Sequence, residues 1–367
     1  MIVLACLAVI FASCKVRPET APKSNQQTDK DHPFTEAFRK TNGWVAGDGA
    51  TSVPLSDGRV LWLFGDSHID DYDAATRTIP CLFQVRNAAM LQDGNSLGGW
   101  RTLLGKGPGN RSLFQHPTDL KLWFWPVSGF QQGNAVYVYL TCLRKTGEGT
   151  FGFEAVGHFW GKMKFPEMKV IEYIPLPEFN GIDFGCGFVN DKSGFTFAFG
   201  NKQTLTTSDV YVARFKTENP AGDWSYWDGK AWSANIGNAS VIAKGASTSV
   251  NVCRITNNFL LTTSSFSVAC DQGNEILTSF SENPTGPFSP LKKIWTLDDT
   301  VEGHFPFFYL PVAHPEFING KNELLVTYSI NGYEPCLPAC VNGRMNPDHY
   351  RPKAIRVPLE IIDPKLH

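Results

Sequence analysis

Two aspartates, Asp48 and Asp66, stand at the two open ends of one predicted β-hairpin. The segment reads GWVAGDGATSVPLSDGRVLWLFGDSHIDD, residues 43–71. Its Ser-Asp-Gly tip at residues 56–58 suits a three-residue loop with glycine in the left-handed conformation. Following the ladder outward from this loop places Asp48 opposite Asp66. A two-residue Asp-Gly turn would instead place Asp48 opposite Ser67, with both acids still at the same open end.

Two facing carboxylates could cleave a glycosidic bond. Directly opposed strand residues have Cβ atoms about 4.5–5.5 Å apart, and the carboxyl groups of a retaining glycosidase lie about 5–5.5 Å apart. Repulsion between two such charges should raise one pKa, so that one acid keeps a proton near neutral pH. No Arg or Lys lies nearby in the sequence to neutralise the pair. The simpler alternative is that each Gly-Asp is an ordinary turn.

The composition favours a sugar as the partner. Of 367 residues, 42% are hydrophobic and 13% aromatic, which is enough for a large core and for aromatic surfaces on which sugar rings stack. The net charge is −2 and no basic run is present, which argues against a nucleic acid partner. No complete sialidase-type Asp box, nucleophile elbow, phosphate loop or dinucleotide fingerprint occurs. We expect no cofactor and no metal site.

The N-terminal segment predicts export. Residues 1–14 are apolar and of signal-peptide length, and they end in Phe-Ala-Ser-Cys, which resembles a bacterial lipobox. The expected lipid would attach to Cys14 and would be the protein's only link to a membrane, the bacterial outer membrane. A plain secretory signal with an accidental Cys14 is the alternative. Residues 15–40 are expected to include a polar, flexible tether.

The rest of the chain, residues 41–367, predicts one all-β domain, a five-bladed β-propeller. Short apolar or alternating runs are separated by turn residues at intervals of about ten positions. The motif E-N-P-x-G occurs twice, each time after a strand pattern, as expected of repeated blades. The expected blades are residues 43–110, 111–170, 171–240, 241–300 and 301–360. The late strand KAIRVPLEI could return to the first blade and close the ring, and a large irregular sandwich is the alternative. We expect a monomer.

Cysteines of an exported protein can form disulfides. Beyond Cys6 and Cys14, seven remain, so at least one thiol should stay free. Cys336 and Cys340 are close enough for a local bridge, and Cys253 with Cys270 could join adjacent strands.

The hairpin also resembles a known family. NGWVAGDGATSVPLSDGRVLWLFGDSHI is similar to the opening blade of bacterial five-bladed propellers classed as domains of unknown function. That group includes endo-acting D-arabinofuranosidases and lies near the arabinanases and β-fructosidases. HPEFINGKNELLVTYSINGY, residues 314–333, resembles their last blade. The resemblance implies that Asp48 is the nucleophile or base and Asp66 the acid/base. His68 stands where relatives often carry other residues, so it could affect substrate preference.

Other residues could line the same pocket. Trp123 and Trp125 alternate along one strand, so both would share a face and could stack on a sugar, or pack between blades. Trp44 is a similar candidate. Asp183 opens the third blade as Asp48 opens the first, and it could hold a sugar hydroxyl or serve a turn.

The fifth blade offers two further candidates, Glu302 and His304, which could bind substrate or play structural parts. His314 and Glu316 match the family's last-blade pattern, with a strand-entry role as the alternative.

The sequence therefore predicts a secreted glycoside hydrolase that cleaves a furanosidic, arabinan-like polysaccharide by a retaining mechanism. Two rivals remain. One is a glycan-binding propeller without catalysis on the bacterial surface, and the other is a surface protein whose aromatic rim binds another protein.

Overall fold

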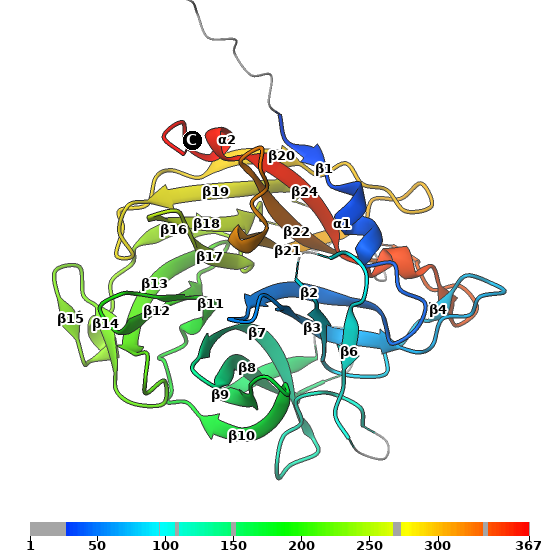
Figure 1. Ribbon diagram of the computed structural model, residues 1–367, viewed down its shortest axis with the longest axis horizontal. Helices are drawn as coiled ribbons and strands as arrows, with labels where there is room; N and C mark the ends of the chain where they lie inside the picture. The colour runs from blue at the N-terminus through cyan, green and yellow to red at the C-terminus, as the bar shows by residue number, and fades with distance from the viewer. Residues whose placement is uncertain are drawn as a thin grey trace, which may run out of the picture.

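The predicted apolar runs form strands that pair antiparallel with their neighbours in the chain. The computed structural model describes residues 27–366, apart from residues 95, 107–109, 148–151, 267–272 and 333–336. Five main sheets surround a central axis, so the prediction of a five-bladed β-propeller is confirmed (Figure 1). The inner strands β2, β7, β11, β17 and β21 contact one another around this axis.

The sheets follow one another in chain order, from the inner to the outer strand. Blade one contains β2 (Trp44–Pro54), β3 (Val60–Ile69), β5 (Ala88–Gln92) and β6 (Arg101–Leu103). Blade two contains β7 (Leu122–Gln132), β8 (Ala135–Lys145), β9 (Phe153–Lys164) and β10 (Lys169–Pro175). Blade three contains β11 (Asp183–Asn190), β12 (Phe195–Gln203), β13 (Ser208–Lys216), β14 (Trp224–Trp227) and β15 (Trp232–Ser233), with β16 (Ala243–Ala246) beside β13. Blade four contains β17 (Val250–Ile255), β18 (Asn258–Ser264), β19 (Glu275–Ser281) and β20 (Lys292–Thr296).

Blade five is completed from both ends of the chain. Its strands are β21 (Phe307–His314), β22 (Glu323–Asn331), β24 (Lys353–Pro358) and, outermost, β1 (Asp29–Lys30). The strand KAIRVPLEI was expected to close the ring on the first blade, but it is the third strand of blade five. The ring is closed by β1 from the N-terminal side, which pairs with β24 and covers its outer edge.

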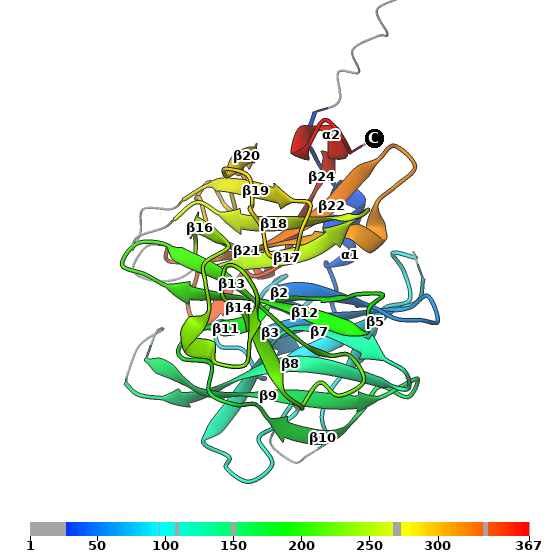
Figure 2. The same cartoon turned by 90° about the vertical axis from the view of Figure 1, so that its left-hand side faces the viewer.

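The structure also corrects the expected tether over residues 15–40. Its last part belongs to the fold, since β1 is followed by helix α1 (His32–Ala37). Phe34 and Phe38 pack against Trp62 of the first blade, with ring centroids 5.7 and 5.6 Å away. A second short helix, α2 (Leu359–Ile362), follows β24, and both helices contact β24 (Figures 1 and 2).

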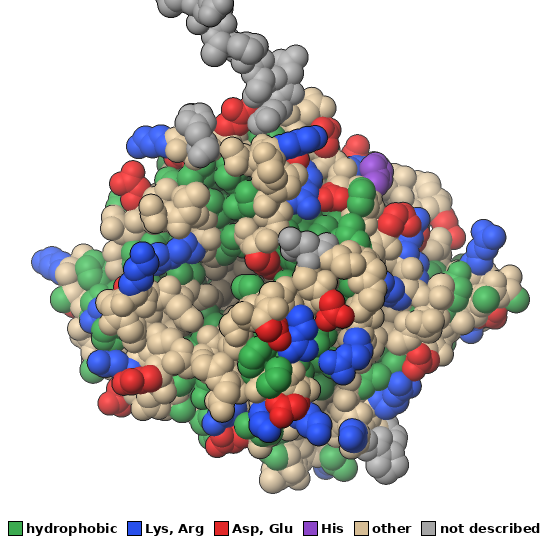
Figure 3. Space-filling model, viewed as in Figure 1, with side chains coloured by type: hydrophobic (Ala, Val, Ile, Leu, Met, Phe, Trp, Pro, Cys, Tyr) green, Lys and Arg blue, Asp and Glu red, His purple; other side chains and the backbone are tan. Residues whose placement is uncertain are grey.

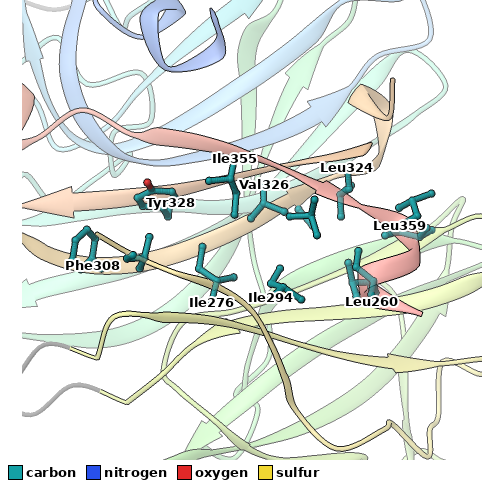
Figure 4. Close-up of a cluster of buried hydrophobic side chains, with 14 of the residues drawn as sticks. Leu260, Ile276, Ile294, Phe308, Leu324, Val326, Tyr328, Ile355 and Leu359 are labelled. Carbon is teal, nitrogen blue, oxygen red and sulfur yellow. The ribbon is translucent and has the colours of Figure 1, made fainter. Parts of the chain in front are cut away.

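The hydrophobic core lies mainly between neighbouring blades. Every residue of β3 is buried, because blades on both sides cover this second strand, and its sequence VLWLFG is accordingly apolar. Figure 4 shows one such cluster, in which Leu260 and Ile276 of blade four meet Val326 and Ile355 of blade five. Burial of these side chains holds each blade at a fixed angle to the next.

A disulfide joins the first and last blades. Cys81 bonds to Cys340, 259 positions away, beside the short pair of strands β4 (Ile79–Pro80) and β23 (Arg344–Met345). The predicted bridge from Cys336 to Cys340 is therefore wrong. Cys253 is a free thiol, so its predicted bond to Cys270 is wrong as well. Sequence spacing favours local pairs, whereas the closed ring brings distant cysteines together.

Cys14 and the expected signal segment fall outside the described residues. Within the described part of the chain, no helix is long and apolar enough to cross a bilayer.

Candidate active site

The site forms where the inner strands begin. Asp48, Trp125 and Tyr309 each lie near the start of an inner strand, on β2, β7 and β21 respectively. Because inner strands of successive blades run side by side around the axis, side chains at these positions converge at one end of it. In the face shown in Figure 3, the surface is hollowed near the middle of the ring, with acidic and hydrophobic side chains around the hollow.

The hairpin that carries both acids forms as predicted. The backbone N–H of Leu55 donates to the carbonyl of Arg59 at 2.8 Å, which closes the three-residue loop. The predicted pairing holds next to the loop, where Val53 faces Leu61 and Thr51 faces Leu63. The turn chemistry therefore sets the register.

Near the acids, the ladder contains irregularities that the sequence did not predict. The register shifts on either side of Gly49, so Asp48 faces the Gly65–Asp66 pair and has no single opposing residue. Gly49 and Ala50 both have positive φ, 102° and 52°. Such bulges redirect side chains, and here the carboxylate of Asp48 lies over Gly65. A Cβ atom at Gly65 would come within 2.5 Å of its Oδ1.

Two tyrosines from the fifth blade and the loop before β24 hold Asp48. The hydroxyl of Tyr309 donates to Oδ2 of Asp48 at 2.9 Å, and the hydroxyl of Tyr350 lies close enough to this carboxylate to help to stabilise its charged form. Burial raises the pKa of Asp48 to about 6, while the two hydroxyl donors oppose the rise. Burial together with the nearby acid raises the pKa of each tyrosine well above 10, so both remain donors at neutral pH.

Asp66 is more deeply buried than an ordinary surface acid, with 9% of the residue exposed. The indole N–H of Trp125 donates to its Oδ1 at 3.2 Å, and a guanidinium nitrogen of Arg86 lies 3.4 Å from its Oδ2. Burial is the largest cause that raises the pKa of Asp66 to about 7, and repulsion by Asp48 is the next. Arg86 and Trp125 oppose this rise.

The two acids therefore differ in the way that acid–base catalysis requires. Because the acids repel each other and burial raises the pKa of both, the pair loses its two protons in coupled steps, and the rise is larger for Asp66. That one acid holds a proton near neutral pH stays a prediction, and the larger rise in pKa makes Asp66 the candidate. The arrangement can present a carboxylate and a carboxylic acid to one bound molecule.

Two predicted sugar-binding residues lie in the core. Trp44 is fully buried, and its indole N–H donates to Ser67. His68 is 1% exposed, and its Nδ1 lies 2.7 Å from Asp71. Neither ring can contact a substrate, so both predictions are wrong. Alternation along a strand puts every second residue on one face, but in a propeller both faces of these strands are covered by other parts of the fold.

The structure places three other predicted residues, Trp123, Trp125 and Asp183, in different surroundings. Trp125 contacts Asp66 directly, as described above, and Trp123 is partly buried beside Arg86. Asp183 opens β11 as expected, and its carboxylate accepts from Gly185 N–H at 3.1 Å and lies 3.8 Å from His158. No contact between Asp183 and either acid is found, so its role in substrate binding stays a prediction.

Glu302 and His304 flank a turn before β21. Glu302 is exposed and lies 3.3 Å from the buried ring of His349, the residue before Tyr350. It therefore approaches the site through this neighbour. His304 is exposed, and within the described chain its side chain contacts neither acid.

Tyr309, Tyr350 and Arg86 were not anticipated. Tyr309 could have been found by its place at the start of the fifth inner strand, which matches that of Asp48 in the first. Tyr350 and Arg86 come from connecting segments that carry no motif. Arg86 is also the cation whose absence near the acids was inferred from the sequence, and the fold brings it there from 20 positions away.

His314 and Glu316 lie at the other end of the inner strand. His314 is fully buried between Ser52 and Thr327, 2.6 and 2.8 Å away, and Glu316 also bonds to Ser52. Burial lowers the pKa of His314 to about 3, so the ring is neutral. This network joins β2 to β21 and β22, which indicates a structural role.

No group of three or more His, Cys, Asp or Glu side chains is placed to hold a metal ion within the described residues.

The fold and the acid pair define a class, that of five-bladed β-propellers with a two-carboxylate cavity. The chain belongs to the family described as Domain of unknown function (DUF5005), whose model matches residues 31–359. No curated protein matches the chain.

Several solved structures share the fold. A candidate hydrolase from Bacteroides ovatus ATCC 8483 is similar over 92% of this chain and 93% of that one, with a TM-score of 0.72 and 20% identity. Inulosucrase from Halalkalicoccus jeotgali bound to kestose is similar over 79% and 77%, with a TM-score of 0.50 and 15% identity. The GH43 BlXynB protein from Bacillus licheniformis is similar over 90% of this chain and 59% of that one, with a TM-score of 0.50 and 10% identity. At these identities the likeness establishes the fold.

Replacing Asp66 with Asn should stabilise the protein at high pH. The pKa of Asp66 is about 7 when folded and about 4 in an unfolded chain. The folded state therefore binds more protons over this window, and the free energy of unfolding falls as pH rises through it. Because Asn cannot ionise, we expect Asp66→Asn to gain about 1–3 kcal/mol at pH 8 and almost nothing at pH 4, measured by denaturant unfolding.

Asp73→Asn is the matched control. The backbone N–H groups of Thr76 and Ala75 hold the pKa of Asp73 below its ordinary value, so its replacement should give no gain at pH 8. Equal stability of Asp66→Asn and the parent at pH 8 would contradict the argument.

Proposed function

We propose that this protein is a glycoside hydrolase that cleaves a furanosidic, arabinan-like polysaccharide. The observation that carries the proposal is the pair Asp48 and Asp66, which lie side by side in the first blade, close enough for the charge of Asp48 to raise the pKa of Asp66 to about 7. Glycosidases use one charged carboxylate and one carboxylic acid on either side of the bond to be cleaved. The two acids are in these states between the two pKa values.

The proposed reaction is retaining. Asp48 attacks the anomeric carbon while the proton of Asp66 passes to the leaving oxygen, which breaks the glycosidic bond and leaves a glycosyl ester on Asp48. Asp66, now charged, takes a proton from water, and the resulting hydroxide releases the sugar from Asp48. Tyr309 orients the Asp48 carboxylate through Oδ2, and Trp125 fixes the orientation of Asp66.

The choice of substrate rests on similarity. The hairpin resembles a group that contains D-arabinofuranosidases, and the fold is shared with an inulosucrase bound to kestose and with a GH43 protein. Kestose contains fructofuranosyl units, so the likeness to the inulosucrase favours a furanoside.

Replacing either acid should abolish turnover. We expect Asp48→Asn and Asp66→Asn to lower kcat/KM about 1,000-fold or more on the best substrate of a panel of D-arabinans, L-arabinans and fructans. The parent should show a bell-shaped dependence of kcat/KM on pH with its maximum between about 6 and 7, because the active state lies between these pKa values. NMR of the first product tests for retention at the anomeric carbon.

Sugar binding should survive both substitutions. A parent that binds members of the panel without cleaving any would overturn the proposed activity and favour a glycan-binding propeller. Full activity of Asp48→Asn would remove Asp48 from the mechanism.

A methyl group at Gly65 should displace the Asp48 carboxylate. The added Cβ would lie 2.5 Å from Oδ1 of Asp48, well inside contact distance. A displacement of about 1 Å at a reacting group can cost about 100-fold in rate, so we expect Gly65→Ala to lose about that much in kcat. Gly157→Ala on β9 is the control, because a Cβ there meets no atom within 4 Å. Equal rates for the two variants would contradict the proposed orientation of Asp48.

We also propose that the protein is exported and anchored by a lipid on Cys14. The N-terminal sequence supports this, and so does the disulfide between Cys81 and Cys340, since such bonds persist in oxidising compartments. Cys14→Ser should move the protein from the membrane fraction to the soluble fraction of the cells that produce it. Unchanged membrane association would argue against the anchor.

A further inference from the structure

Arg86 lies beside the acid pair, and most of its guanidinium N–H groups have no acceptor among the described residues. Its side chain is 41% exposed, and its contact with Asp66 is long, 3.4 Å. Among the described residues, the guanidinium donates a hydrogen bond to no other acceptor. Arginine carries five N–H donors in a planar fork, so most of them are available to a bound molecule.

The position of this guanidinium is fixed by its surroundings. The backbone N–H of Arg86 donates to Ser112 at 3.0 Å, and the neighbouring Val85 pairs with Ser67 of β3. The guanidinium carbon lies 4.4 Å from the ring centroid of Trp123 and 4.9 Å from that of Phe83. Contact with aromatic rings covers the faces of a guanidinium and leaves its edge for hydrogen bonding.

In the state that the proposed reaction requires, the positive charge of Arg86 has no charged partner. Asp66 is its only ion-pair partner within the described chain, and the next acid in the cavity is Asp48. When Asp66 is protonated for acid catalysis, Arg86 loses the charged partner and remains a cation beside the opening. A substrate that supplies an anion would restore the pairing.

We propose that Arg86 is a specificity residue that binds a carboxylate on the substrate, so that the preferred glycan carries an acidic sugar unit next to the cleaved bond. The inference rests on the proposed function. Arginine matches a planar carboxylate through two parallel hydrogen bonds. An ion pair between Arg86 and the substrate also weakens the attraction between Arg86 and charged Asp66. This favours the protonated form of Asp66 that the reaction needs.

Calorimetry with two matched disaccharides tests the inference. Digalacturonate and galactobiose differ in carrying a carboxylate or a hydroxymethyl group, and neither contains a furanoside bond for the proposed activity to cleave. We expect the parent to bind digalacturonate at least tenfold more tightly, and Arg86→Gln to abolish the difference. Arg86→Lys should keep part of it, because lysine retains the charge and loses the fork. Arg144→Gln is the control, since Arg144 is exposed and pairs with Glu154 on blade two.

A second readout separates a binding role from a merely structural one. Near pH 7, digalacturonate should bind with uptake of protons, seen as a dependence of the heat on the ionisation enthalpy of the buffer, and Arg86→Gln should remove this uptake. A sulfated disaccharide distinguishes a carboxylate site from a general anion site, and equal affinity for it would overturn the assignment to carboxylate.

The outcomes also separate this inference from the proposed function. Turnover of arabinans with less than twofold preference for digalacturonate would overturn the role of Arg86 and leave the activity intact. Arg86-dependent binding of digalacturonate without turnover of any furanoside, whether neutral or carrying a neighbouring uronic acid, would support the acidic-sugar site and overturn the hydrolase.

Discussion

Two carboxylates in one partly buried cavity cannot both be charged at low energetic cost, and the site is built around this constraint. Burial raises the pKa of both acids, and their mutual repulsion raises that of Asp66 further. The surrounding donors then decide which acid ionises first. Two tyrosine hydroxyls stabilise the charged form of Asp48. Asp66 receives one indole N–H and a long contact with Arg86, which leaves it as the acid that keeps the proton.

The ionisation of Asp48 depends on closure of the ring. Both acids belong to the first blade, whereas Tyr309 and Tyr350 come from the end of the chain. The backbone joins these parts directly, since the N–H of Gly47 donates to the carbonyl of Tyr350 at 2.8 Å and the N–H of Gly49 to the hydroxyl of Ser329 at 3.0 Å.

Further contacts between the N-terminal and C-terminal parts of the chain also hold the ring closed. They include β1 beside β24, the Cys81–Cys340 bond and the pairing of β4 with β23. A propeller that failed to close would leave Asp48 without the two hydroxyls that make it the stronger acid.

Local chemistry explains which features could be predicted from the sequence. The loop at residues 56–58 fixed the hairpin register, and through it the proximity of Asp48 and Asp66, because turn type and pairing are set by neighbouring residues. Strand alternation placed Trp125 on one face with Trp123, and its indole N–H bonds to Asp66, while its contact with a sugar stays a prediction. The predictions for Trp44 and His68 failed because position beside the acids does not reveal that other parts of the fold bury both rings.

Features that depend on closure could not be predicted. The partners of Cys81 and of Asp48 lie more than 250 positions away, and no local pattern marks them. The positive φ of Ala50 could not be predicted from the sequence either, because this conformation is rare for alanine and is imposed by the bulge beside Asp48.

The division of roles between the acids has one further consequence for the cavity. In the proposed reaction Asp66 must hold a proton, yet it lies beside a cation, which favours its charged form. Burial and the charge on Asp48 outweigh Arg86, so the pKa of Asp66 is raised to about 7. A bound anion that paired with Arg86 would weaken its stabilisation of charged Asp66, so the pKa of Asp66 would rise further. In the proposed reaction, the charge of the substrate would therefore be linked to the protonation of Asp66.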